Sequence, residues 1–198
     1  MKKLLGTFFV LASLPAWAQF GEFWFSAGQH LLENRGLGTT NNFGGTKDDY
    51  QLTDGFRFAF RATFNGAGRT GHEVQYAYNR TQLRLNSNGA HTDQGMAIHQ
   101  GGYNYLLYGT SEGIRVRPFA TGGVQFNNFV PPGASATSGG GDSKVGVNYG
   151  GGVKVRLTQL FAVRVDLRQY ISPKPFQLNL KEGWLRQTEI SAGFGIYY

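Results

Sequence analysis

The sequence contains no cysteine, no long apolar run and no helical repeat. The absence of cysteine excludes disulfide bonds, thiolate metal sites and a lipoprotein anchor on an N-terminal cysteine. The apolar run at 4–14 is too short for a transmembrane helix, which needs about 20 residues, and no other window is apolar enough to span as a helix. No segment shows helical periodicity. The sequence therefore excludes a disulfide-rich scaffold, a helical membrane protein and a solenoid.

Glycine and aromatic residues are abundant instead. The 198 residues include 30 Gly, 16 Phe, 10 Tyr and 3 Trp, a mixture that favours strands and tight turns. The length suits one domain or a small closed barrel. The formal net charge of +7 could attract acidic lipid head groups or polyanions. The arginines are scattered singly and no basic–aromatic motif is present, so we expect no nucleic-acid partner.

The first 18 residues predict a secretory signal peptide. Lys2 and Lys3 form its positive start, the run at 4–14 is its apolar segment, and Ala-Trp-Ala at 16–18 matches the small-x-small cleavage pattern. The alternative is a buried N-terminal helix of a cytoplasmic protein. We expect export and cleavage, which would leave residues 19–198 as the mature domain.

Over most of that domain, apolar residues alternate with small or polar ones. In 145–170 a row of Val, Tyr, Leu and Phe alternates with Gly, Lys, Arg and Asp, interrupted by a short connection that predicts a hairpin. In 50–64 a row of Phe residues faces away from Arg57 and Arg61. This period of two predicts eight strands, over 19–32, 50–64, 72–85, 96–108, 114–128, 145–157, 161–170 and 184–198. The connections between them alternate in length, with long loops predicted near 33–49, 86–95, 129–144 and 172–183.

The alternation is irregular in two strands. In 72–85 the parity slips, because Leu83 and Leu85 fall in the polar row, and we expect a β-bulge near 80–82. In 96–108 two glycines interrupt the pattern and both parities carry apolar groups. The third and fourth strands are therefore predicted less sharply than the others.

Side-chain volume indicates which face points inward. An eight-stranded barrel has an interior just wide enough for its own side chains. The bulky apolar row would overfill that interior, whereas the row of Gly, Ala, Ser, Thr and Arg fits it. An outward apolar row matches lipid as a solvent, and a closed barrel satisfies the backbone within a bilayer. We therefore predict an all-β fold, an eight-stranded antiparallel up-and-down transmembrane β-barrel, rather than a soluble barrel with an apolar interior.

The signal peptide, the alternation of long and short connections and the final strand ISAGFGIYY together resemble a known family. The chain is similar to the small eight-stranded outer-membrane barrels of the OmpA/OmpX type and to the outer-membrane β-barrel domain family. The resemblance implies a location in the outer membrane of a Gram-negative bacterium, with lipid and lipopolysaccharide around the barrel, both termini and the short turns in the periplasm, and the long loops outside. It also implies that Phe194, Ile196 and Tyr198 form a signal read by the barrel assembly machinery.

The inward row is rich in charge. We expect a lumen charge network made of Glu22, Arg57, Arg61, Glu73, Arg115, Arg117, Lys154, Arg156, Arg164, Asp166, Arg168 and Glu189. Buried charges need partners, which favours a salt-bridged plug that fills the interior. The basic surplus leaves a second reading open, a narrow polar path that favours anions. Trp24 also lies on the inward parity and is expected to pack against inward arginines.

Other chemistry has little support. Some barrels of this class acylate or deacylate lipopolysaccharide, which needs a nucleophile with a base nearby, and His91 beside Thr92 and Asp93 is the one histidine worth testing. The four histidines are too dispersed for a metal site, and we expect no cofactor. Aromatics near strand ends are expected to form interfacial girdles, and they include Phe20, Phe64, Tyr108, Phe129, Phe161, Tyr170, Trp184 and Tyr198.

The function that we expect is non-enzymatic: a structural or surface-interaction role through the exterior loops, with an unknown extracellular ligand. The alternatives are the narrow anion-favouring pore and the lipopolysaccharide-modifying enzyme.

Overall fold

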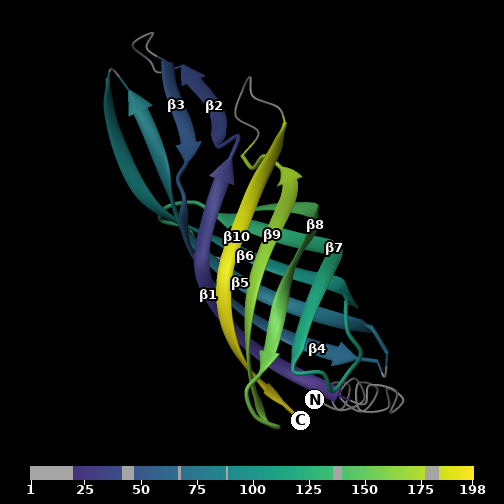
Figure 1. Cartoon of the computed structure of the whole chain (residues 1–198). Helices are drawn as coiled ribbons and strands as arrows, with labels where there is room; N and C mark the ends of the chain where they lie inside the picture. The colour runs from purple at the N-terminus through teal and green to yellow at the C-terminus, as the bar shows by residue number, and fades with distance from the viewer. Residues whose placement is uncertain (1–19, 42–46, 67, 88, 136–139, 177–182) are drawn as a thin grey trace, which may run out of the picture.

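The computed structural model of the chain describes residues 20–41, 47–66, 68–87, 89–135, 140–176 and 183–198. The predicted signal peptide lies outside this part of the chain. The described residues form ten strands (Figure 1): β1 (Phe20–Glu33), β2 (Gly36–Asn41), β3 (Lys47–Leu52), β4 (Gly55–Asn65), β5 (Thr70–Ser87), β6 (Ala90–Tyr108), β7 (Val116–Val130), β8 (Asp142–Arg156), β9 (Phe161–Pro173) and β10 (Trp184–Tyr197). No helix among the described residues is long and apolar enough to cross a membrane.

Eight of these strands close into a barrel. Every neighbouring pair is antiparallel, in the order β5, β4, β1, β10, β9, β8, β7 and β6, and β6 pairs back with β5. The first and last barrel strands pair over twelve positions, from Glu22 opposite Tyr197 to Glu33 opposite Arg186. The predicted eight-stranded antiparallel up-and-down barrel is confirmed.

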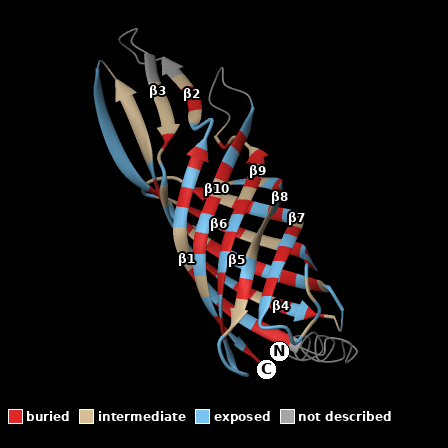
Figure 2. Cartoon of the chain, viewed as in Figure 1, coloured by how far each residue is buried: buried red, intermediate tan, exposed pale blue. Residues whose placement is uncertain are grey.

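Burial alternates along each barrel strand as the sequence pattern predicts. In β4, Arg57 and Arg61 are buried, whereas Phe58 and Phe60 are exposed, Phe60 by 57%. Figure 2 shows this alternation as red and pale blue bands that continue around the barrel. The polar row faces the interior and the aromatic row faces outward, because only the smaller or well-paired groups fit within eight strands.

The change of parity in the predicted strand 72–85 has a different cause from the one expected. The β5–β6 register runs without a shift from Thr70 opposite Leu107 to Ser87 opposite Ala90, so the bulge predicted near 80–82 is wrong. Most of the loop predicted over 86–95 is instead strand, because β5 and β6 continue beyond the barrel. Leu83 keeps the inward parity and packs against buried apolar residues.

The other long connection near the start of the chain also contains strands. The predicted loop 33–49 includes β2 and the start of β3, and the predicted strand 50–64 divides between β3 and β4. β2 pairs with β3, and β3 pairs with β5 from Asp49 opposite Asn86 to Leu52 opposite Leu83. We call the resulting sheet, made of β2, β3, residues 83–87 of β5 and residues 90–96 of β6, the ribbon. It projects from the barrel at the upper left of Figure 1.

The ribbon defines the two ends of the barrel. The ribbon end carries the sheet and the longer connections. At the opposite end, which we call the terminal end, β1 begins and β10 finishes, and Gly21 and Tyr198 exchange backbone hydrogen bonds of 3.3 and 3.1 Å.

Candidate functional site

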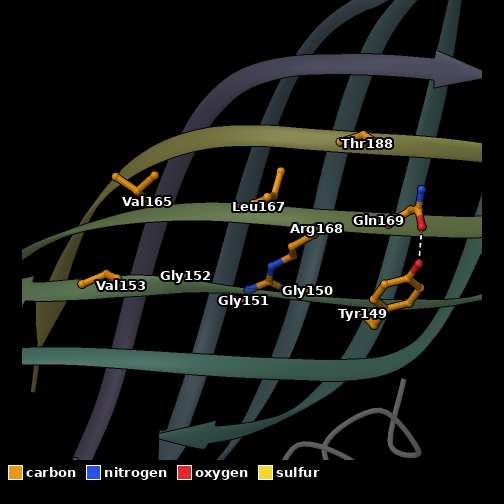
Figure 3. Close-up of a pocket in the computed structure, with 10 residues that line it drawn as sticks. All are labelled: Tyr149, Gly150, Gly151, Gly152, Val153, Val165, Leu167, Arg168, Gln169 and Thr188. Atoms are coloured by element: carbon orange, nitrogen blue, oxygen red, sulfur yellow. Dashed lines mark hydrogen bonds between the residues drawn. The ribbon is translucent and has the colours of Figure 1, made fainter. Parts of the chain in front are cut away.

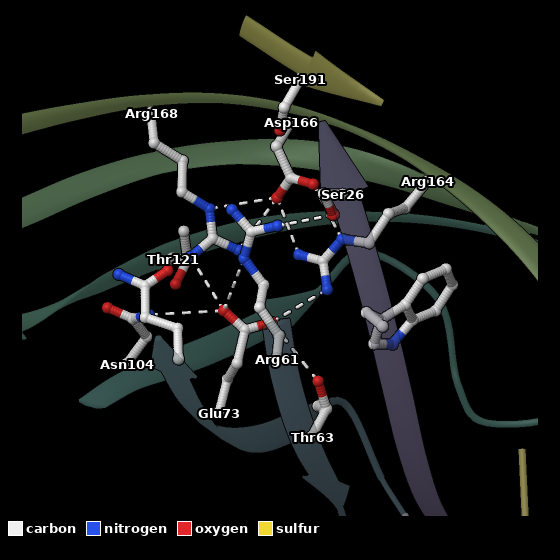
Figure 4. A network of polar contacts seen from close by, with 12 residues as sticks. Ser26, Arg61, Thr63, Glu73, Asn104, Thr121, Arg164, Asp166, Arg168 and Ser191 are labelled. Carbon is white, nitrogen blue, oxygen red and sulfur yellow. Dashed lines mark hydrogen bonds and ion pairs between the residues drawn. The ribbon is translucent and has the colours of Figure 1, made fainter. Parts of the chain in front are cut away.

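The middle of the lumen is filled by an ion-pair network centred on two acidic residues of different strands. Glu73 of β5 contacts Nη1 of Arg164 at 2.9 Å and Nη1 of Arg168 at 2.8 Å, and lies 3.8 Å from Nε of Arg61. Asp166 bridges the same Arg164 and Arg168, with Nη2 distances of 2.7 and 2.9 Å. Figure 4 shows that these side chains converge from opposite walls of the barrel.

A third acid continues the network toward the ribbon end. Glu189 lies 2.6 Å from Nη2 of Arg61 and 3.1 Å from Nε of Arg57. The hydroxyls of Tyr170 and Ser191 donate hydrogen bonds of 2.6 and 2.5 Å to the same carboxylate. All the charged side chains of this central network are completely buried, so each desolvated charge is balanced by opposite charges at contact distance.

A second acid–base pair lies closer to the terminal end. Lys154 binds Glu22, and its Nζ also donates to the Tyr108 hydroxyl at 2.7 Å. Trp24 donates to Glu22 at 2.7 Å, and its ring lies 5.1 Å from the guanidinium carbon of Arg164. The expectation that Trp24 packs against inward arginines is confirmed.

At the terminal mouth, an acid that the sequence pattern missed completes the network. Glu112, in the β6–β7 turn, binds Arg117 and accepts a 3.0 Å hydrogen bond from Nη2 of the half-buried Arg156. Arg115 was predicted to face the lumen but is exposed, because it precedes β7 and the strand alternation does not extend to it. Among the described residues the lumen set becomes seven cations and five carboxylates, so the basic surplus is smaller than predicted.

The inward row turns apolar at the ribbon end. A cluster of buried side chains comes from β1, β2, β3, β6, β7 and β10, and we call it the apolar layer: Leu32, Leu37, Leu52, Met96, Ile98, Phe129 and Leu185. Leu83, Tyr50 and Phe176 pack against it. This layer holds the ribbon on the barrel by hydrophobic burial. The sequence signals for it were the parity of Leu83 and the apolar groups on both parities of 96–108, which include Met96 and Ile98.

Several aromatics assigned to the girdles face inward instead. Phe129 lies in the apolar layer, and Tyr108 and Tyr170 bind charged groups of the lumen. They lie near strand ends as predicted, but they belong to the inward-facing row of their strands. Trp184, Phe161 and Tyr198 are exposed on the outer face.

The histidines form no nucleophile–base pair. His30 bonds Gln187 in the lumen at 2.9 Å, whereas His72 and His99 share hydrogen bonds of 2.6 and 2.7 Å with tyrosine hydroxyls on the outer face. His91 is exposed on the ribbon, within β6 rather than in a loop. No described histidine has a serine partner, and the described residues include no cluster of three or more metal-ligating side chains.

The outer face carries a hollow of about 630 Å³ over β8 and β9 (Figure 3). Its floor is the backbone of Gly150–Gly152, and Val153, Val165 and Leu167 form apolar walls. Gly151 lies in the outward row, where an added Cβ would meet the Phe119 carbonyl oxygen at 2.6 Å. The Tyr149 hydroxyl donates to Gln169 at the rim. The hollow suits an apolar chain and presents no nucleophile–base pair.

Comparison with known families decides where this barrel resides. The chain matches the model of the family described as outer membrane protein beta-barrel domain over residues 7–197. The chain belongs to this family. It is therefore an outer-membrane β-barrel, and its outward aromatic row faces lipid and the lipopolysaccharide environment of that membrane.

Solved structures of other outer-membrane barrels share the fold of this outer-membrane β-barrel. Neisserial surface protein A matches with a TM-score of 0.60 at 14% identity, covering 89% of this chain and 96% of that one. OprG from Pseudomonas aeruginosa matches with 0.57 at 12%, covering 90% and 96%. AlkL matches with 0.53 at 11%, covering 90% of each chain. No curated protein matches the sequence.

The residues predicted as the assembly signal lie on β10, the last strand of this outer-membrane β-barrel, and directly after it. Phe194, Ile196 and Tyr198 are exposed in the outward row, and Tyr198 stacks on Phe23 of β1 at a centroid distance of 5.5 Å. Their recognition by the assembly machinery stays a prediction.

Proposed function

We propose that this protein is a non-enzymatic outer-membrane barrel whose ribbon binds a partner at the cell surface. The proposal includes the orientation that the resemblance implies, with the ribbon end outside and the terminal end in the periplasm. It also includes export by the predicted signal peptide at 1–18 and insertion by the barrel assembly machinery.

The observation that carries the proposal is the construction of the ribbon. β6 pairs with β7 only from Ala97 onward, so residues 90–96 have β5 as their one ladder partner among the described residues. β2 forms the opposite edge, with β3 as its described partner. Exposed strand edges carry unpaired N–H and C=O groups, which can add an extended peptide strand.

The ribbon is also rigid enough to act as a platform. The apolar layer fixes its base, and Arg84 and Asp93 form a bidentate pair across β5 and β6 at 2.7 Å for both contacts. A preorganised edge loses less conformational entropy on binding than a mobile loop.

The buried central network favours a plug over the alternative pore. The paired side chains of Arg61, Glu73 and Arg164 have no solvent-exposed surface, which supports a layer closed to water. We expect the refolded protein to produce no discrete current steps in planar bilayers. Steps that disappear when Glu73 is changed would instead support the pore.

The surface role is tested by shortening the ribbon. A variant in which residues 84–93 are replaced by a two-residue turn keeps the barrel ladder, and we expect cells that carry it to lose adhesion to immobilised extracellular-matrix proteins. Heat-modifiable gel mobility verifies that the barrel still forms. Equal adhesion by the wild type and the shortened variant would contradict binding at the β6 edge of the ribbon. Altered acylation of lipopolysaccharide in cells that lack the protein would favour the enzyme alternative.

A further inference from the structure

Two arginine–tyrosine stacks line the terminal mouth of the barrel. The guanidinium carbon of Arg117 lies 3.7 Å from the ring centre of Tyr108, and that of Arg156 lies 4.4 Å from the ring centre of Tyr197. The single carboxylate of Glu112 lies between the two guanidinium groups and binds both. The stacking fixes both cations in place, so this carboxylate occupies a preformed anion position.

The two arginines offer more donors than Glu112 uses. Nε and Nη2 of Arg117 and Nε of Arg156 are buried and have no hydrogen-bond partner among the described residues. Arg117 is only 1% exposed. On a guanidinium group, Nε and one Nη form an edge that binds two oxygens of a carboxylate or phosphate. Unmatched buried donors of this kind favour an acceptor with more oxygens and more charge than one carboxylate.

Glu112 is attached to the mouth by a turn rather than by a strand. The turn begins after Tyr108, the last residue of β6, and contains Gly109, whose N–H donates to the Pro118 carbonyl at 2.8 Å, and Gly113, which has a φ of 89°. The Glu112 side chain is 7% exposed, whereas Ile114 beside it is 51% exposed. Glu112 can therefore leave the mouth by a movement of the turn that breaks no barrel ladder.

We propose that the terminal mouth binds a phosphate-type oxyanion, and that Glu112 competes with it for Arg117 and Arg156. The incoming oxygens take the position of the carboxylate between the two guanidinium groups and use the donors that Glu112 leaves unmatched. The pair of Lys154 and Glu22 closes the site on its lumen side, so the ligand enters from the terminal end. Free phosphate and the phosphodiester of a lipid head group share this chemistry. The inference does not depend on the surface role of the ribbon.

The test compares phosphate binding by the full refolded protein in an uncharged detergent, measured by titration calorimetry with inorganic phosphate. Glu112→Gln removes the competing charge and keeps the size of the side chain, so we expect it to bind phosphate roughly tenfold to a hundredfold more tightly than the wild type. Arg117→Gln in the Glu112→Gln background should abolish the gain. Arg115→Gln is the matched control, since it removes an exposed arginine of the same turn region and should leave the affinity unchanged.

The outcomes separate the alternatives. Phosphate affinity that is equal in the wild type and Glu112→Gln would overturn the proposal, as would equal losses from Arg115→Gln and Arg117→Gln. Heat-modifiable mobility verifies folding, and if Arg117→Gln does not fold, Arg156→Gln takes its place. Short-chain phosphatidylglycerol below its micelle concentration distinguishes the source. Tighter binding than inorganic phosphate assigns the site to a lipid head group, and weaker binding assigns it to the free ion.

Discussion

The central ion-pair network and the apolar layer both face the interior of the molecule, yet opposite kinds of side chain fill them, and they share only β10 among the strands that supply their buried residues. Around Glu73 the barrel interior is charged and each carboxylate contacts several cations. At the ribbon end the interior consists of Leu, Ile, Met and Phe side chains. Both layers exclude water, but their stability has different requirements. The charged layer is stable only when every charge has its partner, whereas the apolar layer needs only side chains of suitable volume and shape.

The largest expected effect comes from removing one acid of the charged layer. Glu73→Gln leaves Arg164 and Arg168 buried with less compensation, and we expect it to lower the free energy of unfolding by about 3–5 kcal/mol. Urea unfolding in lipid vesicles, followed by tryptophan fluorescence, measures the change. Glu33→Gln makes the same chemical change at an exposed position of β1 and should have little effect. Similar values for the two variants would show that the network does not stabilise the barrel.

A cavity in the apolar layer should cost less. Leu52 is completely buried, and Leu52→Ala is expected to lower stability by about 3 kcal/mol and to accelerate amide exchange in β3. Leu107→Ala on the lipid-facing side is the comparison, because lipid can fill the space that it leaves. If exchange in β3 did not change, the apolar layer would not be what holds the ribbon.

A swap of similar volume in the apolar layer should cost less still. Met96→Leu preserves apolar volume at a buried position of β6, and a loss below about 1.5 kcal/mol is expected in the same urea assay. The charged layer offers no such exchange, since even Glu73→Gln removes a charge. A loss for Met96→Leu as large as that for Glu73→Gln would remove the distinction between the layers.

The smallest effect is expected at the exposed ion pair of the ribbon. The hydrogen bonds from Arg84 lower the pKa of Asp93 below its usual value. The pair therefore stabilises the ribbon at pH values above the pKa that Asp93 has in the unfolded chain. That contribution is lost as pH falls through the lower pKa of the folded state. Amide exchange at the β5–β6 tip should therefore differ between wild type and Asp93→Asn at pH 7 and converge at strongly acidic pH. A difference that persists there would assign the effect to something other than the charge.

The sequence predicted well which residues face inward and how many strands form the barrel, because an alternation with a period of two is a local property of the chain. It did not predict where the interior changes from charged to apolar, since that depends on which strands extend beyond the barrel. For this reason the position of Leu83 was interpreted as a sign of a β-bulge rather than as part of an apolar interior. Arg115 was predicted to lie in the lumen because the alternation of β7 was extended to a residue that precedes the strand. Glu112 was missed because residues in turns do not alternate between two faces.

The pairing of β1 with β10 has a consequence for how the chain reaches its folded form. These two barrel strands are the most distant in the polypeptide, and their pairing, which places Phe25 opposite Phe194, closes the ring of eight strands. In hydrocarbon an unpaired strand edge is costly, so a partial ring of seven strands has two such edges and no favourable place to rest. Barrel assembly should consequently be cooperative around the whole circumference. A barrel that has not closed would differ from the folded one by unpaired strand edges where β1 and β10 should meet.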